Sequence, residues 1–221
     1  MDIEDTQNGQ FQLSQALEAH TREARCVDIK GNYMISGGTD NVAMLYTRED
    51  PTKKWDIKHG YKFFGGFVMD VCFMEDNTEF VVGCQDGKIY ICSTDDCSAP
   101  TLIFEGHKKP VNCVRYRNFN IFSGSWDGTA CIWDLETGDV KSTLGGHPEF
   151  LVAVCPLNND LVVTGGQDGS LHLWKYNGQK VSEKIGAHQG LIRQIAVVEG
   201  GGFMTCSNDE TVKVWDLELS T

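Results

Sequence analysis

Three residues near the middle of the chain carry the side chains of a hydrolytic active site. Ser123 and Asp127 lie in the stretch "SGSWDGTACIWD", and His107 stands 16 residues before the serine. A serine nucleophile, a histidine base and an aspartate that orients the histidine perform acyl transfer in serine hydrolases. One hypothesis is therefore a hydrolase with Ser123 at its centre.

The stretch around Ser123 recurs, and its recurrence argues against catalysis. Related stretches are "SGGTDNVAMLYT", "VGCQDGKIYICS", "TGGQDGSLHLWK" and "TCSNDETVKVWD". The central aspartates are spaced by 46, 41, 41 and 41 residues, at Asp40, Asp86, Asp127, Asp168 and Asp209. Structural units repeat along a chain in this way, whereas a catalytic centre does not, and G-x-S-x-G is absent from the sequence. We therefore expect a scaffold without enzymatic activity.

Each repeat is expected to form four short strands. In the third, "PVNCVRY" alternates apolar and polar residues, and "NIFSGS", "TACIWDL" and "VKSTLGG" follow it. Asp127-Gly128 supplies a hairpin turn, since both central positions of such a turn favour a positive φ. One four-stranded sheet cannot bury both of its faces, so consecutive sheets are expected to stack as blades of a propeller.

Composition limits the classes of function. The chain has 221 residues, of which 41% are hydrophobic, with 24 glycines and 5 prolines, typical of one globular, turn-rich domain. A formal charge of −12 disfavours nucleic acid and anionic membranes as partners. The nine cysteines are scattered without a C-x-x-C, and the start lacks an apolar signal region. These features predict reduced thiols, a cytoplasmic or nuclear location, and neither metal nor cofactor.

Residues 11 to 217 resemble the WD40 repeat family. In that family a buried hydrogen-bonded tetrad joins the histidine of a Gly-His pair, a second-strand Ser or Thr, the turn aspartate and a third-strand tryptophan. Three sets match completely: His107, Ser123, Asp127 and Trp133; His147, Thr164, Asp168 and Trp174; His188, Thr205, Asp209 and Trp215. Such a chain of donors and acceptors leaves no member unsatisfied. Repeat one keeps His20, Ser36 and Asp40 but has Tyr46 for tryptophan.

The second repeat departs furthest from the pattern. It keeps Asp86 alone and has Phe64, Val82 and Cys92 at the other three places. We expect this blade to depend on packing and to be the softest. His59 and His172 fall outside the pattern and are expected at the surface.

The predicted fold is an all-β WD40 propeller of four-stranded antiparallel blades. An acidic tail at 1–10 precedes repeats at about 19–60, 61–102, 103–143, 144–184 and 185–221, and a strand at 11–18 is expected to close the last blade. Five repeats are fewer than WD40 rings usually have. A closed five-bladed ring, an open arc of a truncated propeller and an assembly with another chain all stay open, and we favour the arc.

Two segments are more specific than the general WD40 pattern. "FQLSQALEAHTREAR" and the stretch from Ile192 to Leu217 resemble the phospholipase-activating, ubiquitin-fusion-degradation family of WD40 proteins, as does "FSGSWDGTACIW". The resemblance implies a propeller that binds ubiquitin on its top face in protein degradation or sorting. It also implies an AAA ATPase partner, held by a separate C-terminal domain that only a longer form would carry. The alternative is a general WD40 scaffold for other proteins.

The blade geometry predicts where a partner binds. Residues three and five after the tetrad histidine, and the residue before the turn aspartate, should lie at the top rim: Glu23, Arg25, Thr39; Phe67, Met69, Gln85; Pro110, Asn112, Trp126; Phe150, Val152, Gln167; Leu191, Arg193, Asn208. Many are apolar, and an exposed apolar patch marks a binding site. With Glu23 and Glu149 beside it, this patch would complement the apolar, basic-edged surface of ubiquitin. Alternatively, some of these side chains pack down against neighbouring blades.

Overall fold

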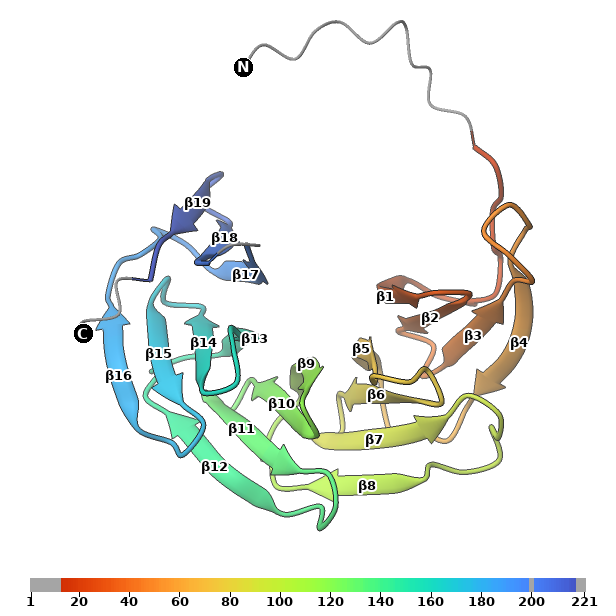
Figure 1. Cartoon of the computed structure of the whole chain (residues 1–221), viewed down its shortest axis with the longest axis horizontal. Helices are drawn as coiled ribbons and strands as arrows, with labels where there is room; N and C mark the ends of the chain where they lie inside the picture. Colours follow the sequence, from red (N-terminus) through yellow and green to blue (C-terminus); the bar gives the residue numbers. More distant parts are fainter. Residues whose placement is uncertain (1–12, 199–200, 218–221) are drawn as a thin grey trace, which may run out of the picture.

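A computed structural model describes residues 13–198 and 201–217, and this part of the chain folds as five antiparallel sheets along an arc (Figure 1). We call the sheets blades one to five in chain order. Their strands are β1 (Ala24–Lys30), β2 (Tyr33–Gly38), β3 (Ala43–Thr47) and β4 (Asp56–Tyr61); β5 (Val68–Phe73), β6 (Glu79–Cys84), β7 (Lys88–Ser93) and β8 (Leu102–Glu105); β9 (Val111–Arg117), β10 (Asn120–Ser125), β11 (Thr129–Asp134) and β12 (Val140–Gly145); β13 (Leu151–Pro156), β14 (Leu161–Gly166), β15 (Leu171–Lys175) and β16 (Lys180–Lys184); and β17 (Ile192–Val197), β18 (Phe203–Ser207) and β19 (Val212–Trp215). The all-β propeller predicted from the repeats is confirmed.

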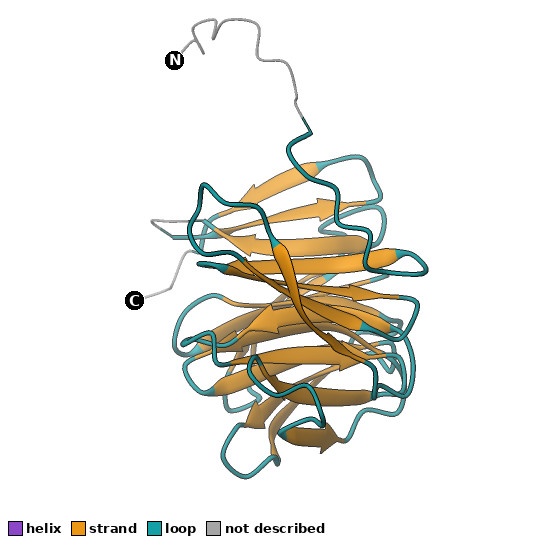
Figure 2. Cartoon of the chain, turned by 90° about the vertical axis from the view of Figure 1, so that its right-hand side faces the viewer, coloured by secondary structure: helices purple, strands orange, loops and turns teal. Residues whose placement is uncertain are grey.

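The strands run between two sides of the arc on which the loops gather (Figure 2). In each blade the first strand lies at the inner edge of the arc and the later strands lie progressively outward (Figure 1). No helix in the described ranges is long and apolar enough to cross a membrane.

The hairpin turns between second and third strands need positive φ. Gly87, Gly128 and Gly169 supply it in blades two to four, and Asn41 and Glu210 adopt it in blades one and five. At Gly128 a Cβ would also come within 2.9 Å of the His147 carbonyl oxygen of the next blade. The Asp-Gly turn therefore serves both the hairpin and the close approach of neighbouring blades.

The hydrophobic core lies between blades. Ile35 of blade one shares a cluster with Phe80 of blade two, and Val81 of blade two shares one with Trp133 of blade three. The same arrangement continues to blade five. Each sheet thus buries its faces only by stacking on its neighbours, as expected for a repeat protein.

The expected closing strand does not form in the described residues. Residues 13–18 lie in no strand, residues 11 and 12 and the tail at 1–10 lie outside the described part, and blade five has three strands there. Gln15 instead bonds the backbone of Trp55 through both amide atoms, at 2.7 and 2.9 Å, which holds this segment beside blade one. β19 lies at the other end of the arc, and the described residues 13–18 do not pair with it (Figure 1).

Candidate functional site

The predicted tetrads of blades three and five are buried hydrogen-bonded chains. Nδ1 of His107 donates to Asp127 over 3.0 Å, and the hydroxyl of Ser123 lies 2.7 Å from Nε2 of the same ring. Trp133 Nε1 donates to that hydroxyl oxygen over 2.7 Å. His188, Thr205, Asp209 and Trp215 repeat the arrangement in blade five.

Burial rules out Ser123 as an accessible nucleophile. Its side chain has an exposed fraction of 0%, and its oxygen already accepts the indole N–H of Trp133. A substrate carbonyl could reach the hydroxyl only if blade three opened. The residues required by the hydrolase hypothesis are therefore present, but they are buried and hydrogen-bonded in a way that stabilises blade three.

Blade four forms a variant of the tetrad. His147 and Trp174 both contact the Thr164 hydroxyl at 2.9 Å, but His147 Nδ1 is 3.6 Å from Asp168. The Ser170 hydroxyl bridges them, 3.2 Å from Nδ1 of His147 and 2.7 Å from an oxygen of Asp168. The chain of polar contacts thus runs through one additional residue.

The expectation that His172 lies at the surface is wrong. Its ring is buried and stacks on that of His147, with ring centroids 4.1 Å apart and an angle of 14° between the planes. Nδ1 of His172 has no hydrogen-bond partner in the described part of the chain. The side chain lies on the third strand two residues before Trp174 and faces the tetrad, a position at which the other repeats have Met, Tyr, Cys or Lys.

Blades one and two replace the tryptophan in different ways. In blade one the Tyr46 hydroxyl lies 3.3 Å from Ser36 Oγ, so the tetrad is kept with a longer contact. In blade two the Tyr90 hydroxyl donates to Asp86 over 2.6 Å, and Phe64 packs edge-on against Tyr90. Blade two therefore has aromatic packing and one hydrogen bond in place of a tetrad, and its lower stability stays a prediction.

The pKa values of the tetrad histidines shift in opposite directions in blades three and four. Burial disfavours the charged form of His107, but its hydrogen bond to Asp127, the neighbouring Cys131 and the aspartate charge raise its pKa to about 9. Burial, and then the nearby charge of His172, lower the pKa of His147 to about 4.

These shifts predict stability losses on both sides of neutrality. Unfolded histidine has a pKa of about 6.5, so stability from His147 is full above that pH and falls towards pH 4. Stability from His107 is full below about pH 6.5 and falls as the pH rises to about 9. We expect each loss to be on the order of 1–3 kcal/mol, measured by urea unfolding across this pH range. In His147→Gln, the free energy of unfolding should no longer fall between about pH 6.5 and pH 4, and its decrease at higher pH should be unchanged. If it still fell below pH 6.5 as steeply as in the parent chain, the loss would not come from His147.

The rim positions predicted from the repeats meet in pairs in all five blades. The residue before the turn aspartate donates its N–H to the carbonyl of the residue three after the tetrad position. These bonds join Thr39 to Glu23, Gln85 to Phe67, Trp126 to Pro110, Gln167 to Phe150 and Asn208 to Leu191, at 2.8 to 3.0 Å. Blade two keeps this geometry without a tetrad histidine. The backbone of the rim is thus the same in all five blades, while the side chains that it carries differ.

Two aromatic rings dominate the rim at the junction of blades three and four. Trp126 and Phe150 stack with centroids 5.3 Å apart and planes at 20°. Trp126 Nε1 donates to Asn112 Oδ1 over 3.2 Å, and Asn112 Nδ2 donates to the Val152 carbonyl over 3.1 Å. The side chain of Phe150 is 38% exposed. The only polar side-chain atom of the pair, Trp126 Nε1, thus has a hydrogen-bond partner, and this bond helps to fix the apolar surface of the two rings at the rim.

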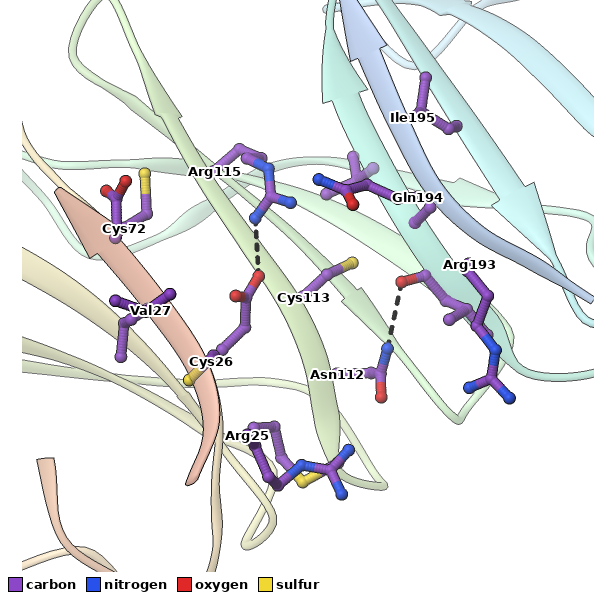
Figure 3. A pocket seen from close by; sticks show the side chains of 17 residues that line it. Arg25, Cys26, Val27, Cys72, Asn112, Cys113, Arg115, Arg193, Gln194 and Ile195 are labelled. Carbon is purple, nitrogen blue, oxygen red and sulfur yellow. Dashed lines mark hydrogen bonds and ion pairs between the residues drawn. The ribbon is translucent and has the colours of Figure 1, made fainter. Parts of the chain in front are cut away.

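The remaining rim side chains divide into exposed and partly buried groups. Phe67, Val152 and Leu191 are half-buried and Met69 is buried, so the apolar patch is smaller than its sequence suggests. The exposed members are Glu23, Arg25, Gln85, Gln167, Arg193 and Asn208, with Arg193 Nε donating to Asn208 Oδ1 over 2.8 Å. Arg25, Asn112 and Arg193 line a cavity on the inner face of the arc (Figure 3), and its volume is about 560 Å³.

Sequence reasoning missed Lys109 and Ser170. The ammonium of Lys109 lies 5.6 Å from the ring centre of Phe150, a cation–π contact at the rim. Ser170 stands two residues after the turn aspartate, where Thr129 and Thr211 stand in blades three and five and also bond the aspartate. The D-x-S/T spacing could have identified Ser170.

Comparisons with known proteins agree with this geometry. The family model described as "WD domain, G-beta repeat" matches residues 58–93, 98–134, 138–175 and 179–216. Protein DOA1 of Saccharomyces cerevisiae (strain ATCC 204508 / S288c) is 28% identical over 214 residues, which are 94% of this chain and 29% of that protein. A ribosome biogenesis protein WDR12 homolog of Drosophila virilis is 24% identical over 72% of this chain and 42% of its own length.

A solved structure has the same fold over almost the whole chain. The crystal structure of the WD40 beta propeller domain of Doa1 superimposes with a TM-score of 0.82 at 25% identity, covering 93% of this chain and 69% of that one. The chain thus spans less than half the length of these two curated relatives and about two thirds of the solved propeller.

Proposed function

Because this chain belongs to the WD domain, G-beta repeat family, whose propellers are protein-interaction modules, we propose that it binds ubiquitin or ubiquitinated proteins through its top rim. The stacked Trp126–Phe150 pair is the observation that carries the proposal. The sequence resemblance to the ubiquitin-binding, ubiquitin-fusion-degradation family supports it.

The aromatic pair has the properties of a binding hot spot. It joins two blades, it is apolar and partly exposed, and the Asn112 side chain already satisfies the indole N–H. A partner therefore meets a rigid surface that loses little conformational entropy on binding. Such a surface fits an apolar patch on a folded protein.

The charges beside the pair are of both signs. Glu149 is exposed immediately before Phe150, and the Lys109 ammonium lies 5.6 Å from the centre of the Phe150 ring. Glu23 is exposed farther away, on the rim of blade one. Arg25 and Arg193 instead line the inner cavity (Figure 3). The net charge of −12 makes a protein with basic residues beside its apolar surface a better partner than a nucleic acid or an anionic membrane.

This role places the chain in protein degradation or sorting in the cytoplasm or nucleus. An AAA ATPase would be a partner only of a longer form that carries an additional C-terminal domain. A general WD40 scaffold for other proteins is the competing function, and the same binding experiment separates the two.

The decisive experiment titrates mono-ubiquitin into the chain and into Phe150→Asp. We expect this substitution to weaken binding by about tenfold or more, which is about 1.4 kcal/mol, because it puts a charge into the apolar contact. Isotope-labelled ubiquitin monitored by NMR gives both the affinity and the contacted face.

Phe119→Asp is the matched control. Phe119 is an exposed phenylalanine in the turn between β9 and β10, whereas the rim lies on the loops at the other ends of these strands. We expect it to leave ubiquitin binding unchanged, with melting temperatures near that of the parent chain for both variants. An absence of binding at high micromolar ubiquitin, or equal losses in both variants, would exclude the ubiquitin proposal and leave the scaffold function.

A further inference from the structure

The fourth strand of blade four differs from its counterparts in the burial of one residue. An apolar residue stands three positions before the tetrad position of the next blade, at or near the end of each fourth strand: Tyr61, Phe104, Leu144 and Ile185. Tyr61, Phe104 and Leu144 are 0%, 2% and 0% exposed, whereas Ile185 is 68% exposed. The repeat pattern therefore assigns Ile185 to the core, and the structure turns it to solvent.

A one-residue difference in strand register accounts for the exposure of Ile185. In blades one to three the buried residue pairs with the third-strand residue three before the tryptophan position: Ala43 with Tyr61, Ile89 with Phe104, and Ala130 with Leu144. In blade four the corresponding Leu171 pairs with Lys184. β16 has thus slipped by one residue relative to β4, β8 and β12, and such a slip moves side chains to the opposite face.

A cavity lies where Ile185 would pack in the common register. It has a volume of about 320 Å³, and its apolar walls include Leu171, Leu173, Phe203 and Trp215. The corresponding residues one blade earlier are Ala130, Ile132, Val162 and Trp174, and all four share a core cluster with Leu144. Trp215 is only half-buried, whereas Trp133 and Trp174 are buried. The side of the cavity that faces β16 is thus built like an aliphatic side-chain site, while Ser182, Glu183 and Lys184 of β16 itself line the opposite side.

Glu183 explains why the slipped register is occupied. In the common register it would stand where Ser142 stands in β12, and the Ser142 hydroxyl donates to the Tyr176 carbonyl over 2.6 Å. The corresponding acceptor in blade five is the Leu217 carbonyl, to which a carboxylate cannot donate. In the slipped register Glu183 instead pairs with Lys180 at 2.8 Å on the surface. Gly186, with φ of +63°, provides the turn that directs Ile185 outward.

We propose that β16 is a two-register strand that can slide by one residue and seat Ile185 in the cavity between blades four and five. The slipped register keeps Glu183 solvated and leaves the cavity open. The common register buries Ile185 against Trp215 and completes the wall of blade five. The outer strand of blade four can therefore adopt two forms: an open form, with the cavity empty of Ile185, and a closed form, with Ile185 in the cavity.

The test is a double-mutant cycle between Glu183 and Ile185. Glu183→Ser supplies the hydroxyl that β12 has at this position, and we expect it to shift the equilibrium towards the closed form by about tenfold or more. The urea midpoint should then rise in the parent chain but not in Ile185→Ala, which lacks the side chain that fills the cavity. Val181→Ala is the control background, because Val181 is an exposed aliphatic residue of β16 that does not face the cavity, and this background should keep the rise.

A structural measurement accompanies the cycle. In a methyl-labelled chain the δ1 methyl of Ile185 should move upfield on Glu183→Ser, because the indole of Trp215 then lies against it. A rise of equal size in the parent chain and in the Ile185→Ala background, or an Ile185 methyl that stays at its solvent-exposed position in Glu183→Ser, would overturn the proposal.

Discussion

Replacing Ser123 with alanine is expected to lower the free energy of unfolding by about 2–4 kcal/mol, measured by equilibrium unfolding in urea. The Ser123 hydroxyl contacts Trp133 Nε1 and His107 Nε2, each at 2.7 Å. Alanine removes both contacts at once and leaves two buried polar atoms without a partner. Each such atom costs on the order of 1–3 kcal/mol, and some relaxation around the smaller side chain reduces the sum.

Ser142→Ala is the control for this prediction. Its hydroxyl makes one bond, to the Tyr176 carbonyl over 2.6 Å, so we expect a loss of about 1 kcal/mol. Folded Ser123→Ala should bind partners at the rim normally, since Trp126 and Phe150 are untouched. If Ser123→Ala were as stable as the parent chain while abolishing a hydrolytic turnover, the buried tetrad would be an active site after all.

The repeat made most of the fold predictable from the sequence. The spacing of the turn aspartates locates the hairpins, and the Ser or Thr that recurs before every turn except that of blade two identifies tetrads that the structure contains. Rim positions also follow, because the backbone bond from Trp126 to Pro110 has a counterpart in every blade. Local sequence suffices for these features since each is formed within one blade.

Features that depend on contacts outside the repeat pattern could not be predicted. Met69 counts as a rim residue by position, yet it is buried. His172 has no tetrad role in the family pattern, and its burial depends on stacking against His147. The slip of β16 reflects a balance between Glu183 and Ile185 that no single repeat contains. Arc closure likewise depends on where β19 stands relative to the other end of the arc (Figure 1).

The inner strands are linked by side chains that reach from one blade to the next. Asp28 accepts the N–H of Phe73 over 2.7 Å, and Asp70 accepts the N–H of Val114 over 3.0 Å. The side-chain amide of Asn112 in blade three donates to the Val152 carbonyl of blade four. Because the two ends of the arc do not contact each other, the stability of the chain depends on every interface between neighbouring blades.

Asp70→Ala is expected to lower the free energy of unfolding by about 2–3 kcal/mol, again measured in urea, with blades one and two separating from the rest in a broadened transition. Asp70 also holds the Arg115 guanidinium at 2.7 Å, and its loss leaves that cation beside the inner cavity without a counter-charge (Figure 3). The loss is smaller than the roughly 3–5 kcal/mol typical of fully buried pairs because both side chains keep some contact with solvent.

The double variant Asp70→Ala, Arg115→Met tests the cause of that loss. It removes the unpaired charge together with its partner, so we expect it to be more stable than Asp70→Ala alone. Asp28→Ala, which removes one backbone bond between blades one and two and strands no cation, should cost about 1 kcal/mol. If the double variant were less stable than Asp70→Ala, packing of the Arg115 side chain rather than its charge would join blades two and three.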